Sequence, residues 1–275
     1  MASPAQRRSM GVEAASDRDW SELPLDALTS VFAKLGAIEV LMGAGLVCHS
    51  WLDAAKVPDL WRSVDMAHHR MVKEMGGRVF FLSLKRRINC DGLCAMAKAA
   101  VDRSGGQLEV FMGKHFVTDD LLKYIGHRSP SLKCLGLMSC HGVSNEGFTE
   151  LISKAPLLED LQLEQCPNIG GREVFQAAGE ECVRLKRFSL RKGWSFSTWP
   201  QKGEALGVAA MRELRSLTLA GSNVTNDELA AILAGCPHLE LLSVQGCYDV
   251  VADDALRAKC ARIKTLTLPC YRVRG

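Results

Sequence analysis

Leu158-Glu-Asp-Leu161-Gln-Leu163 is the stretch that decides the fold, because its pattern recurs through the chain. Clear copies are Leu132-Lys-Cys-Leu135-Gly-Leu137, Leu214-Arg-Ser-Leu217-Thr-Leu219 and Leu239-Glu-Leu-Leu242-Ser-Val244, and weaker ones begin at Val79, Leu108, Leu185 and Ile263. The first positions, 79, 108, 132, 158, 185, 214, 239 and 263, are separated by 29, 24, 26, 27, 29, 25 and 24 residues. Eight copies in one phase indicate a repeated structural unit.

Each copy alternates apolar and other residues, which predicts a short strand with one buried face. Between copies the apolar residues lie three and four apart, as in Asp227-Glu-Leu229-Ala-Ala-Ile232-Leu233, which predicts a helix. One strand and one helix cannot bury their apolar faces alone, so the units must stack. The pattern and its steps are typical of leucine-rich repeats. We therefore expect an α/β fold in which residues 79–275 form a curved solenoid of seven to eight units, with a concave, strand-lined surface for binding protein.

The composition is that of an ordinary globular protein, with 47% hydrophobic and 24% charged residues among 275. The net charge, 34 − 31 = +3, is too small to predict a nucleic-acid partner. Residues 1–16 have no apolar core and are predicted to be a disordered lead rather than a signal peptide. The uncharged stretch at 40–52 is shorter than the ~18 residues of a membrane span, so no membrane partner is expected.

Six of the 11 cysteines recur at two fixed positions of the repeat. One set lies eight residues after a first leucine (Cys140, Cys166, Cys247), and the other lies three residues before the next one (Cys182, Cys236, Cys260). A fixed phase predicts buried packing positions for a small thiol. An odd number of cysteines without a secretory signal favours reduced thiols, and hence the cytoplasm and/or the nucleus. No ligand set for zinc is present, so no metal and no cofactor are expected.

A different segment precedes the repeats. It starts with Leu23-Pro24, and proline is favoured in the first turn of a helix. Leu28, Val31, Phe32 and Leu35 then follow at helical spacing, and a second apolar stretch runs from Val40 to Trp51. Pro58-Asp-Leu60-Trp61 closes the segment. These patterns predict a helical domain at 17–66 and a joint at 67–78. A domain of this size is marginally stable alone and usually needs a neighbour or partner.

These residues resemble the F-box family, in its plant-type form with cysteine-containing leucine-rich repeats. The resemblance rests on Leu23-Pro24 with Asp26, on Val47-Cys48 with Trp51, and on the closing Pro58-Asp-Leu60-Trp61, in that order and followed by repeats. It implies a three-helix F-box that docks on the Skp adaptor and, through it, on a cullin, while the repeats hold a protein substrate. The adaptor-binding residues implied are Leu23, Pro24, Leu28, Val31, Val40, Leu41, Val47, Cys48 and Trp51.

Two features of this segment leave alternatives open. Leu28, Val31, Phe32 and Trp51 could equally form the internal core of the helical domain. The segment also departs from the family at Gly36-Ala37, where proline is common, and at Gly43 and Gly45, which would weaken the second helix by about 1 kcal/mol each.

No motif of nucleophile, base and orienting group recurs in the chain, so we expect no enzyme. Three functions remain open. The first is a substrate-recognition subunit of a Skp–cullin–F-box ubiquitin ligase, the second is a non-degradative protein-interaction scaffold, and the third is a sensor whose surface is completed by a small ligand. The third would need a deep polar pocket, for which the solenoid is too short.

Two parts of the repeats are candidates for substrate binding. The longest repeat contains Gly193-Trp194-Ser-Phe-Ser-Thr-Trp199-Pro200, and aromatic insertions of this kind either bind a partner or fill the gap left by a missing helix. The second candidate is a polar strip of residues that flank the buried leucines: Asp160, Gln162, Glu164, Arg187 and Arg191. Because neighbouring parallel strands lie ~4.8 Å apart, Asp160 should lie beside Arg187 and Glu164 beside Arg191. The strip is either a stabilising charge ladder or a reader of a charged substrate segment.

Overall fold

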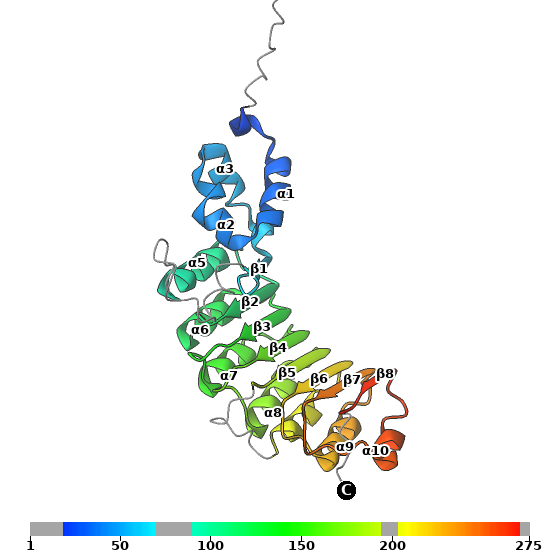
Figure 1. Cartoon of the computed structure of the whole chain (residues 1–275). Coiled ribbons are helices and arrows are strands. Elements are labelled where there is room, and N and C mark those ends of the chain that lie inside the picture. The colour runs from blue at the N-terminus through cyan, green and yellow to red at the C-terminus, as the bar shows by residue number, and fades with distance from the viewer. Residues whose placement is uncertain (1–18, 70–89, 194–202, 270–275) are drawn as a thin grey trace, which may run out of the picture.

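The computed structural model describes residues 19–69, 90–193 and 203–269. A small helical unit lies at one end of a long, curved repeat domain (Figure 1). The predicted lead at 1–16, the repeat copy at Val79, and the candidate residues Trp194 and Trp199 lie outside the described residues.

The repeat domain is built on one parallel sheet of eight strands whose order in space is their order in the chain. The strands are β1 (Ser63–Asp65), β2 (Val110–Lys114), β3 (Cys134–Met138), β4 (Asp160–Glu164), β5 (Arg187–Arg191), β6 (Ser216–Ala220), β7 (Leu241–Gln245) and β8 (Thr265–Thr267). From β2 to β8, each strand begins two residues after the first position of a repeat copy. The predicted solenoid and its strand positions from Leu108 onward are thus confirmed.

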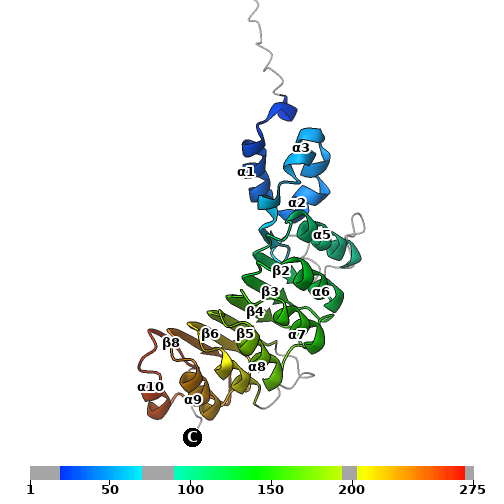
Figure 2. The ribbon, with the colours of Figure 1, turned by 180° about the vertical axis from the view of Figure 1, so that it is seen from behind.

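Helices line the convex side of this sheet and the strands line the concave side (Figures 1 and 2). They are α5 (Cys90–Arg103), α6 (Asp119–Arg128), α7 (Asn145–Ser153), α8 (Arg172–Glu181), the 3₁₀ helix η5 (Glu204–Ala210), α9 (Asn226–Gly235) and α10 (Asp254–Lys259). Side chains of Thr118, Ser144 and Thr225 accept hydrogen bonds from the backbone amide of the third residue of α6, α7 and α9. These caps fix where each strand-to-helix turn ends.

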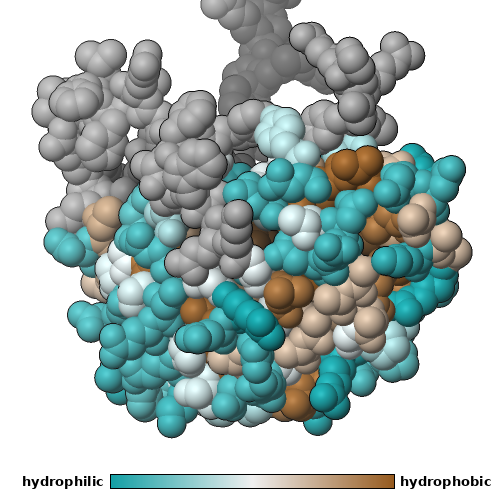
Figure 3. Space-filling model, turned by 90° about the horizontal axis from the view of Figure 1, so that it is seen from below, coloured by the Kyte–Doolittle hydropathy of each residue, from teal (hydrophilic) through white to brown (hydrophobic). Residues whose placement is uncertain are grey.

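The repeat leucines form the core. In β4, Leu161 and Leu163 are buried and pair in register with Leu135 and Leu137 of β3 and with Phe188 and Leu190 of β5. The same alternation continues to β7. The buried side chains at matching positions of successive strands therefore stack in columns along the solenoid. At the far end β8 is the last strand described, and the surface there mixes hydrophilic with hydrophobic residues (Figure 3).

The N-terminal unit contains three α-helices, as predicted for an F-box. They are α1 (Leu25–Leu35), α2 (Ala37–Met42) and α3 (His49–Ala54), accompanied by the 3₁₀ helices η1 (Trp20–Glu22), η2 (Ala44–Leu46) and η3 (Pro58–Trp61). Gly36 joins α1 to α2 with φ +87°, a conformation that proline cannot adopt.

The expected weakening of the second helix by Gly43 and Gly45 is wrong, because neither glycine lies inside it. The helix α2 ends at Met42, Gly43 follows as its C-terminal cap, and Gly45 lies in η2. A side chain at Gly45 would come within 2.9 Å of the Val40 carbonyl oxygen. Gly45 therefore allows the close approach of two backbone segments.

The sheet begins earlier than the sequence predicted. Strand β1, at Ser63–Asp65, lies within the range predicted for the F-box, and it pairs directly with β2 through Val64 and Phe111. Among the described residues, β1 is therefore the first strand of the sheet. The F-box and the repeats also share one continuous core that runs from Leu28 to Ile263.

The two cysteine positions of the repeat are buried, as predicted. Each thiol of the first set donates a hydrogen bond to a carbonyl of the preceding strand: Cys140 to Gly113 (3.8 Å), Cys166 to Leu137 (3.4 Å) and Cys247 to Leu219 (3.7 Å). In the second set, Cys182 donates to Ala155 (3.4 Å) and Cys236 to Val208 (3.5 Å). The cysteines therefore tie consecutive repeats together.

Burial raises the pKa of Cys182 to about 12 and that of Cys236 to about 11. Thiols with a raised pKa remain protonated at pH 8 and do not react as nucleophiles. We expect iodoacetamide at pH 8 to label the exposed Cys90 in the native protein and to label Cys182 and Cys236 only after denaturant is added. Peptide mass spectrometry measures this order, and labelling of Cys182 in the native state would contradict it.

Candidate functional site: the F-box surface and the concave face

Large apolar side chains are exposed mainly on the F-box. Among the described residues, nine large apolar residues are exposed to solvent. Six of them lie in the segment 20–47: Trp20, Leu25, Val31, Leu35, Leu46 and Val47. Val31 and Leu35 lie one turn apart on α1, and Leu46 and Val47 lie at the turn before α3. We call these six residues the F-box apolar surface. An exposed apolar concentration of this kind marks an interaction site.

The predicted adaptor-binding residues divide between this surface and the core. Pro24, Val31 and Val47 are exposed, and Leu23, Leu41, Cys48 and Trp51 are partly buried. Leu28 and Val40 are only 1% and 3% exposed and belong to the core of the F-box, so their direct contact with an adaptor stays a prediction. Both face inward because the small F-box needs them to fill its own core.

Trp51 holds the N-terminal turn in place. Its ring packs edge-on against Phe32 with a centroid distance of 5.5 Å, and its Nε1 donates a hydrogen bond to the Trp20 carbonyl at 2.9 Å. Ser50 donates a second bond, at 2.8 Å, to the Ser21 carbonyl. Trp51 therefore connects η1, which carries Trp20 of the F-box apolar surface, to the buried Phe32 of α1.

Sequence reasoning missed Trp20, Leu25, Leu35 and Leu46 as members of this surface. For Leu25 and Leu35 the signal that could have found them is the helical period of α1, whereas Trp20 and Leu46 lie in the short 3₁₀ helices η1 and η2, which have no such period. Leu28 and Phe32 define the buried stripe of α1, and apolar residues beside that stripe have no place in a core this small.

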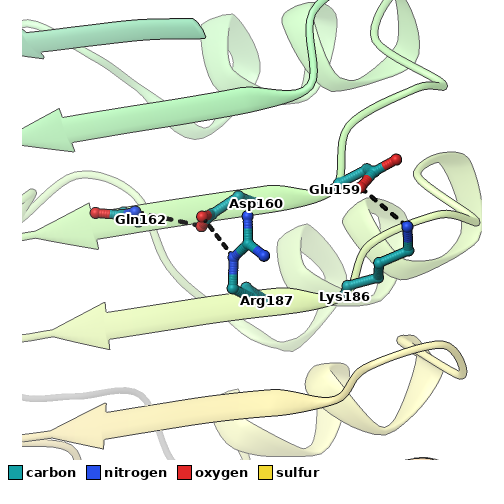
Figure 4. Close-up of polar contacts among 5 residues, drawn as sticks. All are labelled: Glu159, Asp160, Gln162, Lys186 and Arg187. Carbon is teal, nitrogen blue, oxygen red and sulfur yellow. Dashed lines mark hydrogen bonds and ion pairs between the residues drawn. The ribbon is translucent and has the colours of Figure 1, made fainter.

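On the concave face, the polar strip brings oppositely charged residues of β4 and β5 together (Figure 4). The strand register pairs Asp160 with Arg187 and Glu164 with Arg191, as predicted. Arg187 Nε lies 2.8 Å from Asp160 Oδ2, and Gln162 Nε2 lies 3.3 Å from Asp160 Oδ1. The hydrogen bond from Arg187 to Asp160 is the main cause of a raised pKa at Arg187.

The strip is not open along its whole length. Asp160 is 8% exposed, because Arg187 and Gln162 cover its carboxylate. The expectation of an open charged strip is therefore wrong at Asp160, which serves the structure. Glu164 and Arg191 share a register position, but within the described ranges they form no ion pair. Arg191 remains exposed.

We expect Arg187→Ala to lower the free energy of unfolding by about 1 kcal/mol. The change leaves a mostly buried carboxylate with fewer partners, but Arg187 is itself 59% exposed, so solvent screens part of the effect. Chemical denaturation measures the difference. Arg184→Ala is the matched control, because Arg184 is exposed and forms no ion pair with any described residue. An equal effect of both changes would contradict the role of the pair.

The described residues include no group of three or more His, Cys, Asp or Glu side chains that could hold a metal ion. Among the helices described, none alone is long and apolar enough to cross a membrane, although the bent pair Leu25–Leu35 and Ala37–Leu46 meets the criterion by length and composition.

Known proteins share this arrangement. Residues 20–67 match the F-box-like family, and residues 172–273 match the repeats described as FBD-associated F-box protein At5g56370, LRR repeats. The F-box protein SKIP19 of Arabidopsis thaliana is 34% identical over 90% of this chain and 76% of its own length. The chain belongs to the F-box/leucine-rich-repeat family.

Other members of the family are similarly close. The putative F-box/LRR-repeat protein 23 of Arabidopsis thaliana is 36% identical over 92% of this chain, which spans 54% of that relative's length. Among solved structures, a chain of the yeast Rad7 and Elc1 complex covers 78% of this F-box/leucine-rich-repeat chain and 60% of its own length, with 15% identity and a TM-score of 0.40. A likeness this distant carries no functional inference.

Proposed function

We propose that this chain is the substrate-recognition subunit of a Skp–cullin–F-box ubiquitin ligase. The F-box apolar surface docks on the Skp adaptor, which connects the chain to the cullin, and the concave face of the repeats holds the protein substrate. Membership of the F-box/leucine-rich-repeat family supports this role, since such proteins typically serve ubiquitin ligases.

The observation that carries the proposal is the concentration of exposed apolar side chains on the F-box. Val47 is 61% exposed and Leu46 73% exposed, although the unit has a filled core beneath them. Leaving several large apolar side chains in water costs roughly 1.5–3 kcal/mol each, which a partner surface would recover. The candidate adaptor residues are therefore Pro24, Val31 and Val47, together with Leu25, Leu35 and Leu46.

The division of labour follows from the layout. The F-box lies at one end of the solenoid, and the concave strands extend away from it (Figure 1). In this proposal the chain performs no chemistry itself and ubiquitin transfer is carried out by its partners. We also propose that it works in the cytoplasm and/or the nucleus, where cysteines such as Cys140 and Cys182 stay reduced.

Affinity purification from plant cells tests the proposal. With proteasome inhibition, we expect the full chain to retain a Skp adaptor, a cullin and at least one further protein whose amount rises over the untreated sample. A captured adaptor without any protein stabilised by the inhibitor would favour the scaffold function instead. Failure to retain any Skp adaptor would contradict the proposal.

A further inference from the structure

The residue that precedes each strand carries a charge in all eight described strands. Together these residues form one column across the start of the sheet, which we call the charge column: Arg62, Glu109, Lys133, Glu159, Lys186, Arg215, Glu240 and Lys264. The signs alternate at every step except one, between Lys186 and Arg215. Ion pairs link Glu109 to Lys133 (3.1 Å), Glu159 to Lys186 (3.0 Å), and Glu240 to both Arg215 (3.3 Å) and Lys264 (2.9 Å).

The step from Lys186 to Arg215 places two cations on adjacent strands. The backbone amide of Arg215 donates to the Lys186 carbonyl at 2.8 Å, so the two residues are direct neighbours. Each side chain is paired on its outer side, Lys186 with Glu159 and Arg215 with Glu240. No carboxylate of the column lies between them, and like charges directly opposite each other are destabilising.

Strands β5 and β6, which follow Lys186 and Arg215 in the chain, also lack acidic residues on their exposed face. On β5 the exposed positions are Arg187, Ser189 and Arg191, and their register partners on β6 are Ser216, Thr218 and Ala220. The cationic side chains of β5 thus face small side chains across the gap between the strands. We call the set of Lys186, Arg187, Arg191 and Arg215 the β5–β6 seam.

The cations of the seam retain free hydrogen-bonding capacity. Arg187 uses Nε for Asp160, and Arg215 uses Nη1 for Glu240. A guanidinium has five N–H donors, so each still offers several to another acceptor. The side chains are accessible, with 59% of Arg187, 56% of Arg215 and 43% of Lys186 exposed.

We propose that the β5–β6 seam binds an acidic segment of a protein partner. One carboxylate of the segment lies between Lys186 and Arg215 and completes the alternation of the charge column, while a second reaches Arg191. At all the remaining steps of the charge column, a carboxylate on one strand is next to a cation on the neighbouring strand. Asp and Glu side chains therefore fit the site. The identification of this partner as the ligase substrate rests on the proposed function, whereas the binding itself does not.

A fluorescent peptide of alternating Glu and Ser, titrated into the full chain, tests the proposal by anisotropy. We expect it to bind at least about tenfold more tightly than the same peptide with Gln in place of Glu, and its affinity should fall as the salt concentration rises. Equal affinity for the Glu and Gln peptides would overturn the proposal. Binding of a phosphoserine peptide with no measurable binding of the Glu peptide would overturn it too.

Matched variants locate the binding on the molecule. The double variant Arg191→Gln/Arg215→Gln should weaken binding of the Glu peptide by at least about tenfold. Lys264→Gln is the control, because Lys264 is the other cation paired with Glu240 but lies two strands from the seam. It should change the affinity less than twofold. Equal weakening by the control would mean that net charge alone attracts the peptide, and would overturn the assignment to the seam.

The proposed function is tested separately, with the same protein preparations. Skp adaptor binding and thermal unfolding should be unchanged in both variants, because the seam lies on strands remote from the F-box (Figure 1). A chain that binds the Glu peptide but not the adaptor would keep this inference and remove the ligase function. A chain that binds the adaptor but not the Glu peptide would keep the ligase function and remove this inference.

Discussion

The double variant Val31→Glu/Val47→Glu should lose affinity for the Skp adaptor by more than about 100-fold while remaining folded. Both side chains are exposed in the chain alone, 45% and 61%, so the change costs the fold little. In the complex it would replace apolar contacts by carboxylates that are buried without partners, which costs several kcal/mol. Calorimetric titration of adaptor into the chain measures the loss.

The matched control for this result is Val183→Glu. Val183 is 63% exposed and lies after α8 in the repeats, far along the chain from the F-box. It should leave adaptor affinity unchanged within twofold. Retained binding in the double variant would show that the adaptor uses another surface.

Trp61→Ala should lower the free energy of unfolding by about 3–5 kcal/mol. The Trp61 side chain is 1% exposed, and its Nε1 donates to the Ala55 carbonyl at 3.0 Å. The Arg103 guanidinium of α5 lies 5.2 Å from the ring centroid and also reaches the Ala55 carbonyl. Trp61 thus joins the F-box to the first helix of the repeats, and its loss should destabilise both.

Chemical denaturation followed by circular dichroism measures this change. Trp20→Ala serves as the control, because Trp20 is 59% exposed and contributes its backbone carbonyl, not its ring, to the bond with Trp51. It should cost less than about 0.5 kcal/mol. If Trp61→Ala were equally mild, the F-box and the repeats would not be coupled through this residue.

The positions of the strands from Leu108 onward could be predicted from the sequence, because the buried leucines occupy the same positions in each repeat. Matching repeat positions then pair across neighbouring strands, which determines the register of the sheet. The register in turn predicted that Asp160 lies beside Arg187. The beginning of the sheet could not be predicted in this way. Strand β1 has three residues, Ser63–Asp65, with a single buried one, and so it lacks the leucine pattern.

The F-box surface was only partly predictable for a different physical reason. In a small helical unit, apolar residues serve both the core and the partner, and helical spacing alone does not say which side of a stripe is covered. Leu28 and Val31 lie on the same helix, yet one is 1% and the other 45% exposed. The charge column was visible in the sequence only once the register had aligned the residues that precede the strands.

Hydrogen–deuterium exchange of the chain with and without the Skp adaptor tests the central claim most directly. The adaptor should slow amide exchange in the F-box, at 25–35 in α1 and at 44–51 across η2 and the start of α3. Exchange in the concave strands β4 to β7 should be unchanged, so that this face stays free for a substrate. No protection in the F-box, or protection confined to the concave strands, would contradict the account.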